Sequence, residues 1–213
     1  MSDRLVRADD LYARIRDCAR CPLSATRTHA VPGEGSLESE IMFIGEGPGM
    51  NEDRQGRPFV GAAGQFLDEL IGEAGFRREE VYICNVLKCR PPQNRDPMPA
   101  EVEACDDYLQ EQIALIDPLV IVSLGRFSMA RFFPKAKISQ VHGKSRAIGE
   151  RMFVPMYHPA AALHQQSLRE TIREDFRALP SIVEEARALR PGPTGPGEAV
   201  VEEPAARQIP LFE

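Results

Sequence analysis

Four cysteines are the residues of this chain whose types and spacing point most directly to chemistry. Cys18 and Cys21 form a C-x2-C hook near the N-terminus, whereas Cys89 and Cys105 lie far downstream, so only folding can bring the two pairs together. Four thiolates gathered at one point hold either zinc or an iron–sulfur cluster. Ordinary buried or disulfide-bonded cysteines are the alternative interpretation. The hook together with the distant pair favours a metal centre.

The rest of the chain indicates a compartment in which thiols stay reduced. The first ten residues, MSDRLVRADD, are charged and hold no apolar segment, so they do not resemble a secretory signal. No apolar run approaches the roughly 20 residues that a membrane-spanning helix needs. We therefore expect a cytoplasmic protein with no membrane partner. In the cytoplasm, clustered cysteines favour metal binding over a disulfide.

The charge of the chain is unevenly distributed. A formal net charge of -6 argues, by itself, against a nucleic-acid partner. Between Arg126 and Arg151, however, there are seven basic residues and a single acidic one, Glu150. Such a segment could follow a phosphate backbone, or it could be an ordinary solvated surface.

Hydrophobic patterning predicts an α/β fold. Four apolar runs bounded by turn formers indicate buried strands: Ile41–Ile44, Val81–Val86, Leu119–Leu124 and Met152–Met156. Helical patterns alternate with them: Gly64–Ala74, Pro99–Ile116, Phe127–Phe133, and Ala160–Leu189 with a break near Pro180. This alternation predicts a mostly parallel sheet covered on both faces. We expect one domain over residues 1–190, followed by a disordered Pro-, Gly- and Glu-rich tail over residues 191–213.

Polar and glycine-rich segments follow the predicted strands, and parallel sheets place their sites at these carboxyl ends. Gly45-Glu46-Gly47-Pro48-Gly49 follows the first strand, Asn85 ends the second, and His158 follows the fourth. We expect Glu46, Asn85 and His158 to converge on one edge of the sheet, together with Phe59.

Each of these residues has a functional and an ordinary interpretation. The glycine-rich turn could admit an anion or sugar-phosphate, or it could simply be a tight turn. Asn85 could read the edge of a pyrimidine, or cap a loop. Phe59 could stack on a base, or belong to the core. His158 could stabilise a developing negative charge, or fix a loop.

In combination the motifs are far more specific. Gly-Glu-Gly-Pro-Gly, Arg-Pro-Phe-Val-Gly, Asn-Val-Leu-Lys-Cys-Arg-Pro-Pro and His-Pro-Ala-Ala, with the four cysteines interleaved, closely resemble the family 4 uracil-DNA glycosylases. The resemblance covers about Asp10 to Arg177. It implies a three-layer αβα sandwich with a four-stranded, mostly parallel sheet, a [4Fe–4S] cluster, and excision of flipped-out uracil from DNA in base excision repair. The motifs hold no obvious amine nucleophile, so we expect a monofunctional hydrolase without a lyase step. We also expect a monomer.

The resemblance also implies a role for each matching residue. The cluster ligands would be Cys18, Cys21, Cys89 and Cys105, whereas Cys84 matches no ligand position and is expected to be a small buried hydrophobe. Phe59 would stack on uracil, Asn85 would hydrogen-bond its Watson–Crick edge, and His158 would donate to its O2. The turn at Gly45 and Gly47 would border the base. A loop over Ala160 to His164 would enter the DNA and fill the space that the flipped base leaves.

One role stays open. A related family carries a water-activating aspartate at the position of Gly47, and the residue that blocks the thymine methyl there corresponds to Gly49. Glu46 is the nearest carboxylate and our preferred base, and Glu52 is the second candidate. Either could instead offset positive charge on the sugar.

Two other functions remain as alternatives. DNA-trapping relatives carry a basic, His-containing insertion after the Asn motif, but residues 90–99 here read RPPQNRDPMP and hold no histidine, so we expect turnover. The second alternative is a non-catalytic, metal-stabilised nucleic-acid-binding protein on the same scaffold.

The end of the chain suggests a further partner. Gln208–Phe212 resembles the short Gln-x-x-Leu-Phe peptide with which bacterial proteins dock on the replication sliding clamp. A tail with chance hydrophobic residues is the alternative.

Overall fold

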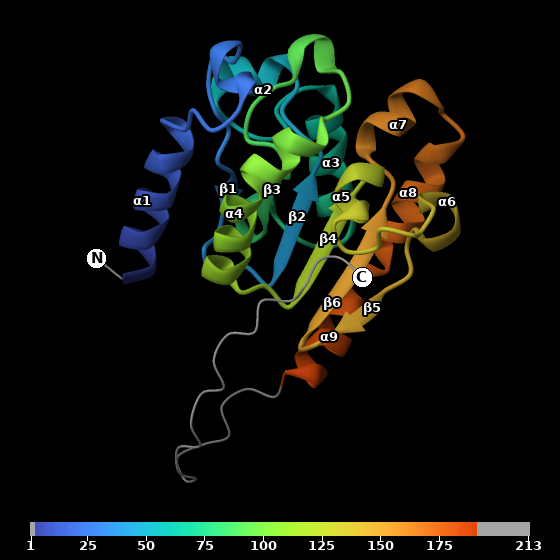
Figure 1. The fold of residues 1–213 in the computed structure, drawn as a ribbon. Helices are drawn as coiled ribbons and strands as arrows, with labels where there is room; N and C mark the ends of the chain where they lie inside the picture. The colour runs from blue at the N-terminus through green and yellow to red at the C-terminus, as the bar shows by residue number, and fades with distance from the viewer. Residues whose placement is uncertain (1–2, 191–213) are drawn as a thin grey trace, which may run out of the picture.

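The protein is built around one mixed β-sheet. The structure, a computed structural model, describes residues 3–190. Its sheet has six strands in the order β1-β3-β2-β4-β6-β5 (Figure 1). Their bounds are β1 (Glu34–Gly35), β2 (Ile41–Gly45), β3 (Tyr82–Asn85), β4 (Val120–Leu124), β5 (Arg146–Ile148) and β6 (Arg151–Met156).

The four central strands are those predicted from the sequence, and they pair in parallel. The prediction of a four-stranded sheet is nevertheless wrong in the number of strands. β1 and β5 add short antiparallel edges. All three residues of β5 are exposed and β1 has only two residues, so neither strand leaves a buried apolar run in the sequence.

Six of the described α-helices lie in the predicted helical segments, with some different boundaries, whereas those over Asp3–Arg16, Met50–Gln55 and Ile138–Val141 were not predicted. The described α-helices are α1 (Asp3–Arg16), α2 (Met50–Gln55), α3 (Ala62–Glu73), α4 (Pro99–Ile116), α5 (Arg126–Ala130), α6 (Ile138–Val141), α7 (Pro159–His164), α8 (Leu168–Arg177) and α9 (Leu179–Leu189). The predicted helix over Ala160–Leu189 is broken twice rather than once, after His164 and at Ala178. Pro180 lies in the first turn of α9, where proline is tolerated.

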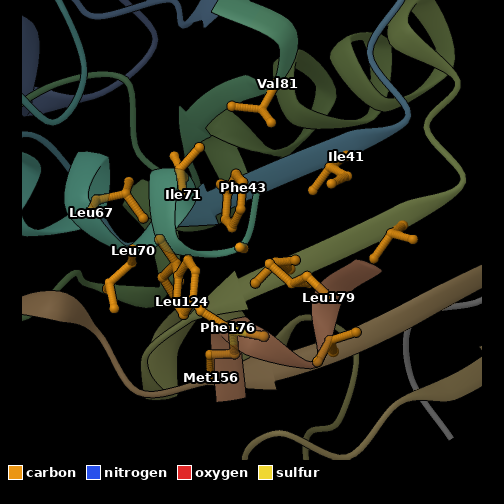
Figure 2. Close-up of a cluster of buried hydrophobic side chains, with 14 of the residues drawn as sticks. Ile41, Phe43, Leu67, Leu70, Ile71, Val81, Leu124, Met156, Phe176 and Leu179 are labelled. Atoms are coloured by element: carbon orange, nitrogen blue, oxygen red, sulfur yellow. The ribbon is translucent and has the colours of Figure 1, made fainter. Parts of the chain in front are cut away.

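Alternating side chains of the strands build a core on each face of the sheet. Ile41 and Phe43 of β2 pack with α3, α8 and α9, and Phe43 stacks on Phe176 at a ring-centroid distance of 5.7 Å (Figure 2). Met42 and Ile44 point to the opposite face, where they pack against α4. α1 contacts α4 at the periphery. Helices therefore cover both faces of the sheet, as predicted.

Parallel pairing brings the carboxyl ends of the central strands to one edge. Gly45 at the end of β2 lies opposite Asn85 at the end of β3, and Leu124 of β4 lies opposite Met156 of β6. The segments after these strands are therefore neighbours in space. None of the described helices is long and apolar enough to span a bilayer. The predicted tail and its clamp-binding peptide lie outside the described residues.

Candidate active site

A cavity of about 610 Å³ opens at this edge of the sheet. Five of the predicted site residues line it: Glu46, Glu52, Phe59, Asn85 and His158. Gly47 lines it as well, whereas Gly45 lies behind Asn85 and Phe59. A Cβ atom at Gly45 would come within 2.7 Å of Phe59 Cζ, so glycine at this position leaves room for the two side chains that form the cavity floor.

Asn85 brings an unsatisfied acceptor to this cavity. The residue ends β3 and is only 2 % exposed. Its Oδ1 is buried and has no hydrogen-bond partner in the described part of the chain. A buried oxygen without a donor costs about 1–3 kcal/mol, so such an atom in a cavity indicates a ligand with an N–H group.

Phe59 is held in a strained backbone conformation beside the cavity. Its φ of 50° is rare for a residue with a bulky side chain. Arg78 donates to the carbonyl oxygens of Pro58 and Phe59, at 2.7 and 3.3 Å. The ring stacks against His158 with centroids 5.5 Å apart and an interplanar angle of 25°. One flat face is thus fixed at the base of the cavity.

Glu52 holds the other end of the same loop. Its Oε1 accepts hydrogen bonds from the N–H groups of Val60 and Gly61, both at 2.8 Å. This oxygen is therefore committed to the loop. The contacts support a positioning role for Glu52 rather than that of a free base.

Replacing Glu52 separates these two roles. For the uracil excision that the sequence resemblance implies, Glu52→Gln keeps an oxygen for the two N–H groups and should retain the rate to within about threefold. Glu52→Ala should lower the rate about tenfold or more, because the Phe59 loop is released. Single-turnover excision from a uracil oligonucleotide measures both. Equal, large losses in the two variants would instead assign a proton-transfer role to the carboxylate.

His158 is oriented by the helix that it begins. It is the N-cap of α7, and its Nδ1 accepts a hydrogen bond from the Ala160 N–H at 3.1 Å. Burial lowers the pKa of His158 to about 4, although the charge of Glu52 opposes this shift. The ring is therefore neutral near pH 7, with its proton on Nε2 as a hydrogen-bond donor.

Glu46 is the carboxylate that lines the cavity without a hydrogen bond between its side chain and another described residue. Burial raises the pKa of Glu46, the nearby Asp96 raises it further, and Arg126 opposes them. Asp96 and Arg126 form an ion pair of 2.6 Å with each other. This environment resembles that of a general base whose affinity for a proton has been increased.

The four predicted cysteine ligands gather beside one hydrophobic cluster. Cys89 and Cys105 are buried in it, and Cys18 and Cys21 pack against it. Arg27 donates to Cys89 Sγ at 3.1 Å. Burial raises the pKa of Cys105 to about 11, and the neighbouring thiols Cys89 and Cys21 add to this effect. A thiolate at Cys105 would therefore need a positively charged group, such as a metal, to stabilise it.

Cys84 lies apart from these four. It is fully buried among Met42, Ile44 and Tyr82 on the α4 face of the sheet. Among residues 3–190, no three His, Cys, Asp or Glu side chains surround the position of one metal ion. An iron–sulfur cluster binds each thiolate to a different iron and does not require such an arrangement.

Comparisons with known proteins identify the family of the chain. The model of the uracil DNA glycosylase superfamily matches residues 32–179. The type-4 uracil-DNA glycosylase of Archaeoglobus fulgidus is 48% identical over 180 residues, which cover 80% of this chain and 90% of that protein. The type-4 enzyme of Thermotoga maritima is 46% identical over 175 residues, covering 80% and 91%. The chain belongs to the type-4 uracil-DNA glycosylases. The predicted family is thereby confirmed.

The structure corrects one expectation for this family member. The segment Ala160 to His164 belongs to a short helix, α7, as the helical pattern from Ala160 predicted, and not to the loop that the resemblance implied. Ala160, Ala161 and His164 line the cavity, and Leu163 is 41% exposed. The His-Pro sequence explains the helix, because His158 caps it and Pro159 occupies its first position.

Two residues were missed in the sequence: Arg78, which holds the Phe59 loop, and Asp96, which lines the cavity. Arg78 lies in Arg77-Arg78-Glu79-Glu80, a charge run that resembles solvated surface, and Asp96 lies in a Pro-rich loop. The basic segment between Arg126 and Arg151 carries less uncompensated positive charge than its sequence indicates. Arg126, Arg131 and Arg151 pair with Asp96, Asp106 and Asp117.

Proposed function

We propose that this protein hydrolyses the N-glycosidic bond of uracil in DNA and leaves an abasic site for base excision repair. The observation that carries the proposal is the unpartnered Oδ1 of Asn85, which lies in one cavity with the fixed ring of Phe59 and the neutral imidazole of His158. An amide, an aromatic face and a hydrogen-bond donor are the groups needed to hold a flipped pyrimidine.

The preference for uracil follows from the hydrogen-bond donors and acceptors of the cavity. The imide N3–H of uracil supplies the donor that Asn85 Oδ1 lacks, and the amide Nδ2 of the same residue donates to O4. Cytosine has no hydrogen at N3 and carries an amino group in place of O4, so it offers the opposite pattern. Phe59 supplies a stacking face that is already ordered before the base arrives.

Bond cleavage needs stabilisation of the departing base. As the glycosidic bond breaks, the sugar becomes cationic and negative charge collects on uracil, partly at O2. The Nε2–H of His158 donates to O2, and since the ring is neutral it does so without giving up a proton. Glu46 then accepts a proton from the water that attacks C1′, or stabilises the sugar cation as a carboxylate.

The raised pKa of Glu46 predicts the acid limb of the pH–rate profile. Asp96→Asn removes a nearby negative charge, so the pKa of Glu46 should fall and excision should persist to lower pH. The measurement is the single-turnover rate across the acid limb. Asp107→Asn, at an exposed aspartate that pairs with Arg20, is the matched control and should leave the limb in place. A limb that does not move in Asp96→Asn would exclude Glu46 as its origin.

We also propose that Cys18, Cys21, Cys89 and Cys105 hold a [4Fe–4S] cluster. When bound, the cluster supplies covalent ties between the N-terminal hook, the segment after Asn85 and helix α4. The guanidinium of Arg27 beside Cys89 provides the kind of hydrogen bond and positive charge that cluster sulfurs receive. Zinc at the same thiolates is the competing occupant.

The two types of cysteine should behave differently on substitution. Cys105→Ser should lose most of the bound iron and sulfide and the broad visible absorbance after anaerobic purification. Cys84→Ser is the matched control, and it should keep them because Cys84 lies on the other side of α4 among apolar residues. Stoichiometric zinc without iron in the wild-type protein would contradict the cluster.

The remaining parts of the proposal concern architecture and partners. We assign the sheet and its two helical faces to the three-layer αβα sandwich of the superfamily, with uracil-containing DNA as substrate of a cytoplasmic monomer. A sliding clamp bound through Gln208–Phe212 is proposed from the sequence alone.

One assay tests the activity. The protein is incubated with single- and double-stranded uracil oligonucleotides, which are then treated with alkali and separated on denaturing gels. Alkali-dependent cleavage at uracil is expected. Absence of cleavage would favour a non-catalytic nucleic-acid-binding protein, and an SDS-stable protein–DNA band would favour a DNA-trapping relative.

A further inference from the structure

A lysine is completely buried next to the cavity. Lys88 is only 1% exposed, and its Nζ donates to the backbone oxygen of Asn85 at 2.6 Å and to Gln112 Oε1 on α4. Lysine is almost never fully buried unless it is paired, because removing its charge from water is costly. Within residues 3–190 the ammonium donates to two neutral oxygens, so the contact is not an ordinary buried salt bridge.

The hydrogen bonds continue beyond Gln112. Its Nε2 donates to the Pro32 carbonyl oxygen at 2.6 Å and to the Tyr82 hydroxyl at 3.0 Å. The hydroxyl of Tyr82 in turn lies 2.8 Å from that of Tyr12 on α1. The backbone of Asn85 is thereby connected to two helices, at a position where water cannot substitute for the protein groups.

The turn after Asn85 is fixed from two sides. On the side of β2, the N–H groups of Val86 and Leu87 donate to the carbonyl oxygens of Gly45 and Glu46, both at 2.9 Å. On the side of α4, the ammonium of Lys88 holds the Asn85 carbonyl. Lys88 also lies close enough to Cys105 to lower the pKa of that thiol, so one residue adjoins both the base-reading residue and a proposed cluster ligand.

We propose that Lys88 is a positioning residue, which sets the orientation of the Asn85 amide through its backbone oxygen and links that amide to the helix that carries Cys105. The inference rests on the proposed function, since it concerns the reading of uracil. An amide that makes two hydrogen bonds to one base edge loses both when it rotates or shifts by a fraction of an ångström, so its support affects binding directly.

The test uses Lys88→Met in the purified, iron-loaded protein. Methionine keeps an unbranched side chain of similar length but donates no hydrogen bond. Calorimetry with free uracil should show binding weakened by about tenfold or more. Binding of abasic-site DNA, which lacks the base, should stay within about twofold of wild type. Iron per chain is measured to compare equally loaded proteins.

Tyr82→Phe is the matched control. It removes the hydroxyl that lies between Gln112 and Tyr12 in the same network and leaves both hydrogen bonds of Lys88 in place. It should bind uracil like the wild type. Lys88→Gln, which is shorter but still carries a donor, should fall between wild type and Lys88→Met.

The outcomes separate this inference from the proposed function. A wild-type protein that neither binds nor excises uracil would refute the function itself. An active wild type with unchanged uracil binding in a folded Lys88→Met or Lys88→Gln variant would overturn only the role of Lys88. Equal loss of uracil and abasic-DNA binding, or failure of both variants to fold while Tyr82→Phe folds, would make Lys88 a general structural residue and would also overturn it.

Discussion

Replacing His158 with alanine should lower the single-turnover rate of uracil excision by about 10²–10³-fold, the usual cost of removing one donor to a developing oxyanion. The Nε2–H of His158 is the donor that we assign to uracil O2, and its orientation depends on the hydrogen bond that Nδ1 accepts from Ala160. Binding of uracil DNA should change much less than the rate, because negative charge on O2 develops as the bond breaks.

His158→Asn is the control for the role of His158 as the N-cap of helix α7. Asparagine is a favoured N-cap, so this variant should keep helix α7 in place while losing the imidazole donor. Both variants should be slow, but His158→Ala alone should also lose about 1 kcal/mol of stability from the missing cap. A normal rate in His158→Asn would show that the cap, and not the donor, is what excision requires.

The depressed pKa of His158 adds a pH criterion to the same prediction. Since the folded pKa is about 4 against an ordinary value of 6.5, the excision rate should show no inflection near pH 6.5 from this residue. The free energy of unfolding, in contrast, should depend on pH through this residue. The unfolded chain takes up a proton below about pH 6.5 that the folded protein refuses until about pH 4, so His158 lowers stability as the pH falls through this window.

The second large effect is expected at Asn85. Asn85→Ala removes both hydrogen bonds to the base edge, so excision should fall by about 10²–10³-fold or more, as expected for a site built around buried polar groups. The melting temperature should not fall with the excision rate: we expect it to equal or exceed that of the wild type. The reason is that the substitution also removes a buried oxygen that has no donor in the described structure, an atom whose desolvation weakens the folded state.

Excision and thermal unfolding of the same preparation test both halves of this prediction. Asn51→Ala is the matched control. Asn51 is an exposed amide beside Gly61 in the Phe59 loop, and its substitution should affect neither measurement strongly. A strongly destabilised Asn85→Ala protein would mean that the amide supports the fold. An active one would remove Asn85 from base recognition.

Strong local patterns made much of this structure predictable. The central strands were found because both of their faces are buried, which produces the runs around Phe43, Ile83 and Val122. Helix α4 was predicted with its observed bounds, since Pro99 starts it and Asp117 in a left-handed conformation ends it. The edge strands were missed because exposed, very short segments carry no such pattern.

The cavity residues were found for a different reason. Glu46, Asn85 and His158 follow parallel strands, and this topology alone brings them together. Long-range side-chain contacts do not follow from the pattern of one segment. Arg78 donates to the Phe59 carbonyl oxygen, and the buried Lys88 donates to that of Asn85. Both contacts depend on three-dimensional packing, so a role for these two residues could not be predicted from the sequence.

The edges of the sheet bear on how the protein behaves at high concentration. Exposed strand edges offer free N–H and C=O groups with which a second molecule can pair and begin to aggregate. Here the parallel core ends in β1 with two residues and β5 with three, and Arg146 begins the latter. So little backbone is presented, beside a charged side chain, that edge-to-edge association is disfavoured. The short edge strands β1 and β5 thus help to keep the protein from aggregating at high concentration.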